Sequence, residues 1–94
     1  MEFEWDESKS KACSKYRGFD FEYVLACFFD PNQIVKQDQR WDYGEDRFQL
    51  FGKIDQRLFA VVYTVRESTI RIISARKANH REVKEYEINT SKDR

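Results

Sequence analysis

The side chains best suited to chemistry lie at the end of the run 69–78, which reads Thr-Ile-Arg-Ile-Ile-Ser-Ala-Arg-Lys-Ala. Its isoleucines predict a buried strand, and this strand ends at Arg76 and Lys77. A guanidinium stays protonated, and its planar fork matches a phosphate or a carboxylate. Just beyond, Asn79 and Glu82 have the spacing of a capping box that opens a helix. An arginine on a rigid strand beside a helix N-terminus is well placed to hold a phosphate.

Each charged candidate also has a purely structural explanation. Arg76 either clamps a phosphate or pairs with a carboxylate such as Glu82. Arg71 is expected on the opposite face from Arg76 because side chains alternate along a strand, and there a structural ion pair is the better explanation. Arg47 is either a second clamp or a salt-bridged strand end. Glu45 either acts as a general base or only orients Arg47.

Three ring side chains are further candidates. His80 is the only imidazole in the chain, so it is either a general acid or an exposed surface histidine at the start of a helix. Trp41 and Tyr43 occur in a polar segment. They suit stacking on nucleic-acid bases, burial under a protein partner, or simple anchoring of a loop.

The bulk properties indicate one small domain. The chain has 94 residues, 36% of them charged, and no apolar run approaches the ~20 residues of a membrane-spanning helix. The N-terminus lacks a secretory pattern, so we expect a cytoplasmic protein that makes no membrane contact. Cys13 and Cys27 are expected to be reduced thiols, because a disulfide is rare without secretion. With one histidine and no CxxC motif, no metal site is expected.

Charge is distributed unevenly along a chain of zero net charge. Residues 1–46 carry 6 Lys and Arg against 11 Asp and Glu, whereas residues 47–94 carry 11 against 6. A basic half suits a polyanion bound on one face of the protein. Alternatively, the two halves pack together and neutralise each other.

The N-terminal part predicts a short strand at 3–5 followed by two helices. The first helix, 7–16, has Asp6 as its N-cap and Gly18 at its C-terminal end. A thin stripe at helical spacing is expected to face inward, formed by Trp5, Lys9, Ala12, Cys13 and Tyr16. The second helix, 21–29, begins after Asp20 and has the firmest apolar face, Phe21, Val24, Leu25 and Phe28.

The remainder is expected to be mostly strand. The patterns predict strands at 33–37, 47–51, 58–66 and 69–78, with a loop over 38–46 and a turn at 53–56. Tyr63 is expected in the core. A last helix over 81–87 turns Val83 and Tyr86 inward, and residues 90–94 form a frayed polar tail. The predicted fold class is α+β, with an antiparallel sheet of about four strands packed by two N-terminal helices and one C-terminal helix.

Several of these segments, taken in order, resemble the BrnT family of toxins from bacterial type II toxin–antitoxin pairs. The segments are Trp5-Asp6-Glu7-x-Lys9, Phe21-Glu22, Phe29-Asp30-Pro31, Gly44-Glu45-Asp46-Arg47, Val61-Val62-Tyr63-Thr64, Ile70 to Arg76, and Tyr86-Glu87. The resemblance spans about residues 3–88. It implies a RelE-like fold and a metal-independent ribonuclease, with no cofactor, that cleaves mRNA and blocks translation. It also implies a BrnA-like ribbon-helix-helix antitoxin, through which the toxin would reach operator DNA.

The resemblance implies attack by an RNA 2′-hydroxyl on the adjacent phosphate. The candidates for catalysis are Arg76, Arg47, Glu45 and His80, and those for RNA binding are Arg71, Lys77, Arg17, Trp41 and Tyr43. One motif departs from the family, whose first helix commonly ends in Asn-x-x-Lys-His-Gly. Here Cys13, Tyr16 and Arg17 replace the asparagine, lysine and histidine. Two alternatives therefore stand beside the enzyme: a weakened relative that only binds its antitoxin, and a plain RNA-binding module.

Overall fold

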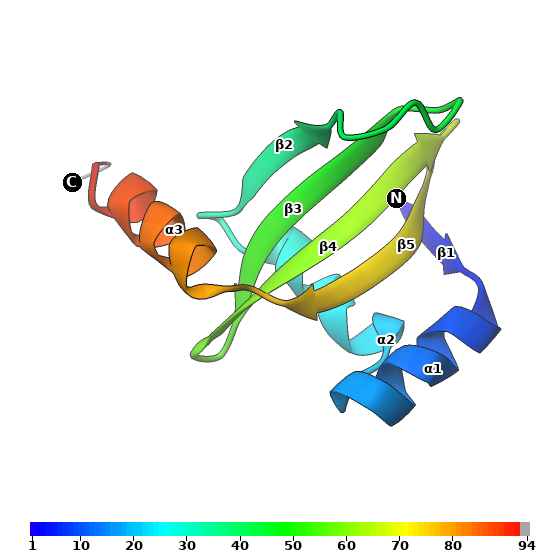
Figure 1. The fold of residues 1–94 in the computed structure, drawn as a ribbon, viewed down its shortest axis with the longest axis horizontal. Helices are drawn as coiled ribbons and strands as arrows, with labels where there is room; N and C mark the ends of the chain where they lie inside the picture. Colours follow the sequence, from blue (N-terminus) through cyan, green and yellow to red (C-terminus); the bar gives the residue numbers. More distant parts are fainter. Residues whose placement is uncertain (93–94) are drawn as a thin grey trace.

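The computed structural model describes residues 1–92, which form one five-stranded sheet with helices on both faces (Figure 1). The sheet has the order β1-β5-β4-β3-β2, so β4 is its central strand. The elements are β1 (Glu2–Trp5), α1 (Glu7–Arg17), α2 (Phe21–Val24), the 3₁₀-helix η1 (Leu25–Phe29), β2 (Ile34–Asp38), β3 (Arg47–Ile54), β4 (Arg57–Arg66), β5 (Thr69–Lys77) and α3 (His80–Lys92). The α+β class is confirmed. The sheet has one strand more than expected and is mixed, because β1 pairs with β5 in parallel.

Local signals set the boundaries of α1. The Asp6 carboxylate accepts a hydrogen bond from the Ser8 backbone N–H at 2.9 Å, and Gly18 ends the helix in the left-handed conformation, with φ 86°. This conformation is open to glycine at little steric cost. The predicted helix over 7–16 is therefore confirmed.

The predicted helix over 21–29 is only partly correct. The α-helical winding stops at Val24 and continues as the 3₁₀-helix η1. The backbone of η1 lies directly on β3, where a Cβ on Gly52 would stand 2.6 Å from the carbonyl oxygen of Cys27. The Cys27 thiol donates in turn to the Gly52 carbonyl at 3.5 Å. Because η1 packs this closely on the sheet, its backbone keeps the tighter 3₁₀ winding.

Two other predicted boundaries were wrong. Strand β3 passes through Gly52 to Ile54, and the expected turn over 53–56 shrinks to Asp55 and Gln56, with Asp55 in the left-handed region at φ 56°. Helix α3 continues to Lys92, so residues 90–92 belong to its last turn, while residues 93–94 lie outside the described part.

Polar side chains in the last turns of α3 bond back to the helix backbone. The Thr90 hydroxyl donates to the Tyr86 carbonyl at 2.9 Å, and the Asn89 side chain donates to the Glu85 carbonyl at 3.0 Å. Both carbonyls lie before the last four residues of the helix, so these side-chain bonds add to the backbone bonds of α3. Val83 and Tyr86 face the sheet, as expected.

The sheet has a covered face and an open face. The covered face lies against α1, α2 and η1 and carries the main core, including Leu50, Val61, Tyr63 and Ile72. On the open face, α3 covers only one end, over a smaller apolar cluster formed by Phe51, Leu58, Ala60 and Tyr86. Both cysteines are free thiols, as predicted, and both are buried. Burial raises the pKa of Cys27 to about 12. Within residues 1–92, no helix is long and apolar enough to cross a membrane.

A β-bulge in β5 changes which side chains share a face. Val62 pairs with Ser74 and Tyr63 with Ile72, so Ile73 is an extra residue in β5. The bulge reverses the alternation beyond it. Arg71 and Arg76 therefore both lie on the open face, and the expectation that they occupy opposite faces was wrong.

Candidate functional site

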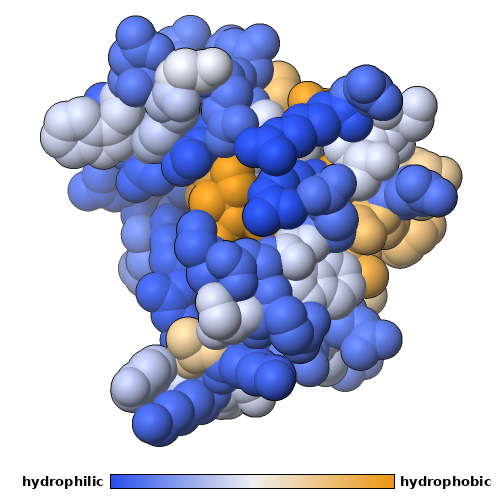
Figure 2. Space-filling model, turned by 90° about the vertical axis from the view of Figure 1, so that its right-hand side faces the viewer, coloured by the Kyte–Doolittle hydropathy of each residue, from blue (hydrophilic) through white to orange (hydrophobic). Residues whose placement is uncertain are grey.

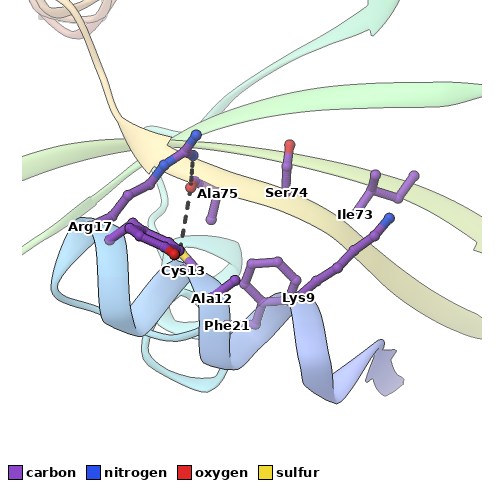
Figure 3. Close-up of a pocket in the computed structure, with 9 residues that line it drawn as sticks. Lys9, Ala12, Cys13, Arg17, Phe21, Ile73, Ser74 and Ala75 are labelled. Carbon is purple, nitrogen blue, oxygen red and sulfur yellow. Dashed lines mark hydrogen bonds between the residues drawn. The ribbon is translucent and has the colours of Figure 1, made fainter.

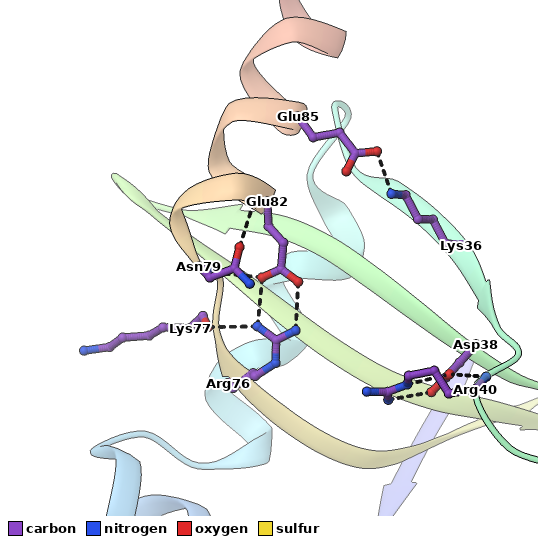
Figure 4. Close-up of polar contacts among 8 residues, drawn as sticks. All are labelled: Lys36, Asp38, Arg40, Arg76, Lys77, Asn79, Glu82 and Glu85. Atoms are coloured by element: carbon purple, nitrogen blue, oxygen red, sulfur yellow. Dashed lines mark hydrogen bonds and ion pairs between the residues drawn. The ribbon is translucent and has the colours of Figure 1, made fainter.

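Arg76 is held on the open face by the first turn of α3 (Figure 4). Its Nη1 and Nη2 atoms donate to the two carboxylate oxygens of Glu82, each at 2.8 Å, and Nη1 also donates to the Lys77 carbonyl at 3.3 Å. These bonds use the far end of the guanidinium. The second fork, made by Nε–H and the remaining Nη2–H, has no acceptor among the described residues. A guanidinium oriented in this way can still take a bidentate anion.

Glu82 joins the end of β5 to the start of α3. Its carboxylate accepts from the Asn79 backbone N–H at 2.8 Å, and its own N–H donates to the Asn79 side chain at 2.9 Å. This is the predicted capping box. The hydrogen bonds from Arg76 lower the pKa of Glu82, and Glu82 in turn raises the pKa of Arg76. The pairing with Glu82, foreseen as the structural alternative for Arg76, is therefore present, and it leaves one fork of the guanidinium available.

A second oriented arginine lies at the start of β3. The Nε of Arg47 donates to Glu45 at 3.1 Å, and its guanidinium lies 4.0 Å from the centre of the Tyr43 ring. Glu45 also accepts from Arg66 at 3.3 Å. The hydrogen bonds from Arg47 and Arg66 lower the pKa of Glu45, which makes it a weaker proton acceptor. The geometry thus favours the orienting role of Glu45 over that of a base.

Arg40 and Lys36 are cations on this face that the sequence did not indicate. Arg40 binds Asp38 through Nε at 2.9 Å and Nη2 at 2.8 Å, and the hydrogen bonds from Arg40 lower the pKa of Asp38 to about 2. The charge of Arg40 is close enough to Arg76 to oppose its protonation. Lys36 pairs with Glu85 of α3 at 2.6 Å. Only the Asp-x-Arg spacing at 38–40 could have drawn attention to Arg40.

The other predicted residues are more scattered. Arg71 pairs with Glu4 at 2.6 Å, as expected of a structural ion pair. Arg17 belongs to α1, and Lys77 pairs with Phe59 on the covered face of the sheet, so neither joins the open-face arginines. His80 is exposed at the first position of α3. Trp41 is 73% exposed in the loop before β3.

The structure therefore groups Arg47, Glu45 and Tyr43 near one end of the open face, in the row of β4 where Thr64 pairs with Arg71. Arg76 lies toward the other end, where β5 pairs with Ala60, and Arg40 adds charge near it. Their carboxylate partners fix the cations in place while leaving guanidinium N–H groups pointing away from those partners. Fixed donors of this kind stabilise charge without reorganising. No group of three or more histidine, cysteine or acidic side chains in residues 1–92 is arranged to hold a metal ion.

The fold and this face define an α+β protein with a five-stranded mixed sheet that presents oriented arginines. Residues 5–82 match the family model described as "Ribonuclease toxin, BrnT, of type II toxin-antitoxin system". The match covers most of the chain, so the chain belongs to the BrnT family of ribonuclease toxins, and the family implies an antitoxin partner. The comparison with curated proteins found no match.

Proposed function

We propose that this chain is an active endoribonuclease that cleaves mRNA in the cytoplasm and so inhibits translation. We further propose that a BrnA-like ribbon-helix-helix antitoxin neutralises it and links it to operator DNA. The observation that carries the proposal is the orientation of Arg76, whose second fork stays open on the open face while Glu82 holds the first. Family membership supplies the reaction class.

The reaction we propose needs no group beyond the RNA and the protein. The 2′-oxygen of the RNA forms a bond to the adjacent phosphorus, and the bond from phosphorus to the 5′-oxygen breaks. The proton of the 2′-hydroxyl passes to a base, and the leaving 5′-oxygen takes a proton from an acid. The products are a 2′,3′-cyclic phosphate and a 5′-hydroxyl.

The arginines supply the charge that this step requires. Arg76 binds the reacting phosphate through its open fork, and Arg40 adds a second positive charge nearby. Arg47 holds a phosphate further along the RNA with the Nη groups that Glu45 leaves available. Negative charge grows on the phosphate oxygens in the transition state, so fixed cations stabilise it more than the ground state.

The proton-transfer and base-binding roles rest on position. His80 is exposed within the Asn79–Glu82 capping box that fixes Arg76, which suits a general acid. Trp41 in the neighbouring loop is available to stack on an RNA base. Glu45 acts as the positioning residue of Arg47.

The test measures cleavage of a single-stranded RNA by the purified chain and by Arg76→Ala. We expect Arg76→Ala to lose about 10²-fold or more in rate, the usual scale for removing one transition-state donor. Arg57→Ala is the matched control, because Arg57 is an exposed arginine outside the open face, and it should retain the full rate. If the wild-type chain binds its antitoxin but leaves RNA intact, the chain is a binding partner only and the enzyme proposal is wrong.

A further inference from the structure

The outer edge of β5 lacks a neighbouring strand along its C-terminal half. Strand β1 pairs only with residues 69–72, so within residues 1–92 no strand lies beside 73–77. The Ala78 N–H donates to the Leu58 carbonyl of β4 at 3.0 Å. Because backbone groups alternate in direction along a strand, Ala75 and Lys77 must point their N–H and C=O groups outward.

The carbonyls of this edge are occupied, and the amides are not. The Ala75 carbonyl accepts from Arg17 Nη1 at 2.5 Å and from the Cys13 thiol at 3.6 Å. The Lys77 carbonyl accepts from Arg76 at 3.3 Å. The N–H groups of Ala75 and Lys77 have no acceptor among the described residues. An edge with unpaired amides is a template for another strand.

Helix α1 forms the opposite wall of a groove along this edge (Figure 3). The groove has a volume of about 420 Å³ and is lined by Lys9, Ala12, Tyr16 and Arg17 of α1 and by 73–75 of β5. Figure 2 looks onto this side of the molecule, where hydrophobic side chains show at the bottom of a hollow among hydrophilic ones.

The groove accounts for the predicted stripe on α1, most of which does not pack against the rest of the protein. The stripe on α1 was expected to face inward, but of its members in that helix only Cys13 is buried. Ala12 is exposed and Tyr16 is 77% exposed. An aromatic side chain and unpaired strand amides thus line the same groove.

The charges that line the groove indicate which kind of molecule binds there. Lys9 and Arg17 line it beside residues 73–75, and no carboxylate does there; the adjoining hollow beside Lys77 is lined by Arg17, Arg57 and one carboxylate, Asp20. Arg17 uses one donor on Ala75 and keeps others for an incoming anion. Outward amides in strand register and an apolar wall suit a polypeptide backbone better than a nucleic acid, whose affinity rests mainly on phosphate contacts.

We propose that an extended, acidic segment of the antitoxin binds in this groove and adds a strand beside residues 73–77 of β5. The segment pairs with the amides of Ala75 and Lys77, packs on Tyr16, and places its carboxylates on Lys9 and Arg17. This inference rests on the proposed function, since it takes the antitoxin as the occupant. A five-residue strand spans about 17 Å, which matches the open length of β5.

The direct test is amide hydrogen exchange of the toxin, alone and in complex with the antitoxin of its own operon. In the free toxin, the amides of Ala75 and Lys77 should exchange quickly, whereas those of Arg76 and Ala78, which point toward β4, should be protected. In the complex, exchange at Ala75 and Lys77 should slow at least ten-fold. A complex in which these two amides still exchange as fast as before would overturn the strand-addition proposal and leave the proposed function standing.

A charge-reversal pair gives an independent readout of the same groove. Lys9→Glu should weaken antitoxin binding at least ten-fold, while Lys11→Glu, which changes the same charge on the same helix outside the groove, should alter it less than two-fold. Both variants should keep the RNA cleavage rate. Equal effects on antitoxin binding would overturn the inference, as would a loss of RNA affinity confined to Lys9→Glu. If no antitoxin binds the wild-type chain, the inference and the antitoxin part of the proposed function fail together.

Discussion

On the covered face of the sheet, β3, β4 and β5 present Leu50, Val61 and Ile72, each almost wholly buried. On the open face, β3 presents Arg47 and β5 presents Arg71 and Arg76, each held by a carboxylate. The first set stabilises the fold by removing apolar surface from water. The second set contributes little net stability, because ion pairs near solvent gain little. The charged residues of the open face therefore serve mainly to orient one another.

The few buried polar groups of the open face support this contrast. Asp38 and Thr64 are buried, and each has partners: Asp38 binds Arg40 and Tyr43, and the Thr64 hydroxyl donates to the Asp46 carbonyl at 2.6 Å. Among the described residues, no buried side-chain nitrogen or oxygen lacks a hydrogen-bond partner. The buried polar groups of this face are thus satisfied, which favours a single arrangement of its side chains.

The largest stability effect should come from the covered face, through Gly52→Ala. The new Cβ would meet the Cys27 carbonyl at 2.6 Å, and backbone cannot move aside cheaply. We expect a loss of about 3 kcal/mol in the free energy of unfolding, measured by urea denaturation. Gly44→Ala is the control, because a Cβ there meets nothing within 4 Å and costs only the left-handed backbone, about 1–2 kcal/mol. Equal losses would contradict the close packing of η1 on β3.

The next largest effect on stability concerns the open face and should come from Glu82→Ala. This change removes the partner of Arg76 and the capping box of α3, for an expected loss of about 1–2 kcal/mol. Because Arg76 keeps its charge but loses its orientation, RNA cleavage should fall by about ten-fold, less than in Arg76→Ala. A cleavage rate equal to wild type in Glu82→Ala would show that the orientation of Arg76 does not matter.

The sequence predicts those features of the two faces that depend on residues close together in the chain. Asp6, Gly18 and the pair Asn79 and Glu82 act within one turn, so their roles could be predicted from spacing alone. The bulge at Ile73 depends on the register of two strands and has no local signal. For that reason the face of Arg71 was predicted wrongly.

The remaining differences are also non-local. Strand β1 has only four residues, and its parallel pairing with β5 joins segments far apart in the chain. The nearness of Arg40 to Arg76 arises from the fold of the loop after β2, which composition does not encode. The residue types of the site were predictable from the sequence, and their grouping required the structure.

A smaller effect concerns pH and Asp38. Its pKa in the folded protein is about 2, below the ordinary value of 3.8, because Arg40 donates to it. The ion pair therefore stabilises the fold at neutral pH, and this contribution, about 1–2 kcal/mol, is lost as the pH falls from about 4 to about 2. Denaturation between pH 5 and pH 2 should show this loss, and Asp38→Asn should reduce the slope. An unchanged slope in the variant would exclude Asp38 as its source.

The smallest effect should come from the ion pair of Lys36 with Glu85. Both side chains are nearly half exposed, so Lys36→Ala should change the free energy of unfolding by no more than about 0.5 kcal/mol. A loss above about 1.5 kcal/mol would show that this pair anchors α3, and that the open face contributes more stability than its exposure implies. Thermal denaturation at two salt concentrations separates the two cases.

Binding of RNA phosphate by the open fork of Arg76 can be followed directly by NMR of its Nε–H group as RNA is added. A single-stranded RNA with 2′-O-methyl groups cannot be cleaved through the 2′-oxygen, so the bound state can be observed. We predict a large shift and slower exchange of the Arg76 Nε–H at saturation, and no change at Arg57. If the RNA saturates the protein while the Arg76 Nε–H signal stays unchanged, the open fork does not bind phosphate and the account of the open face is wrong.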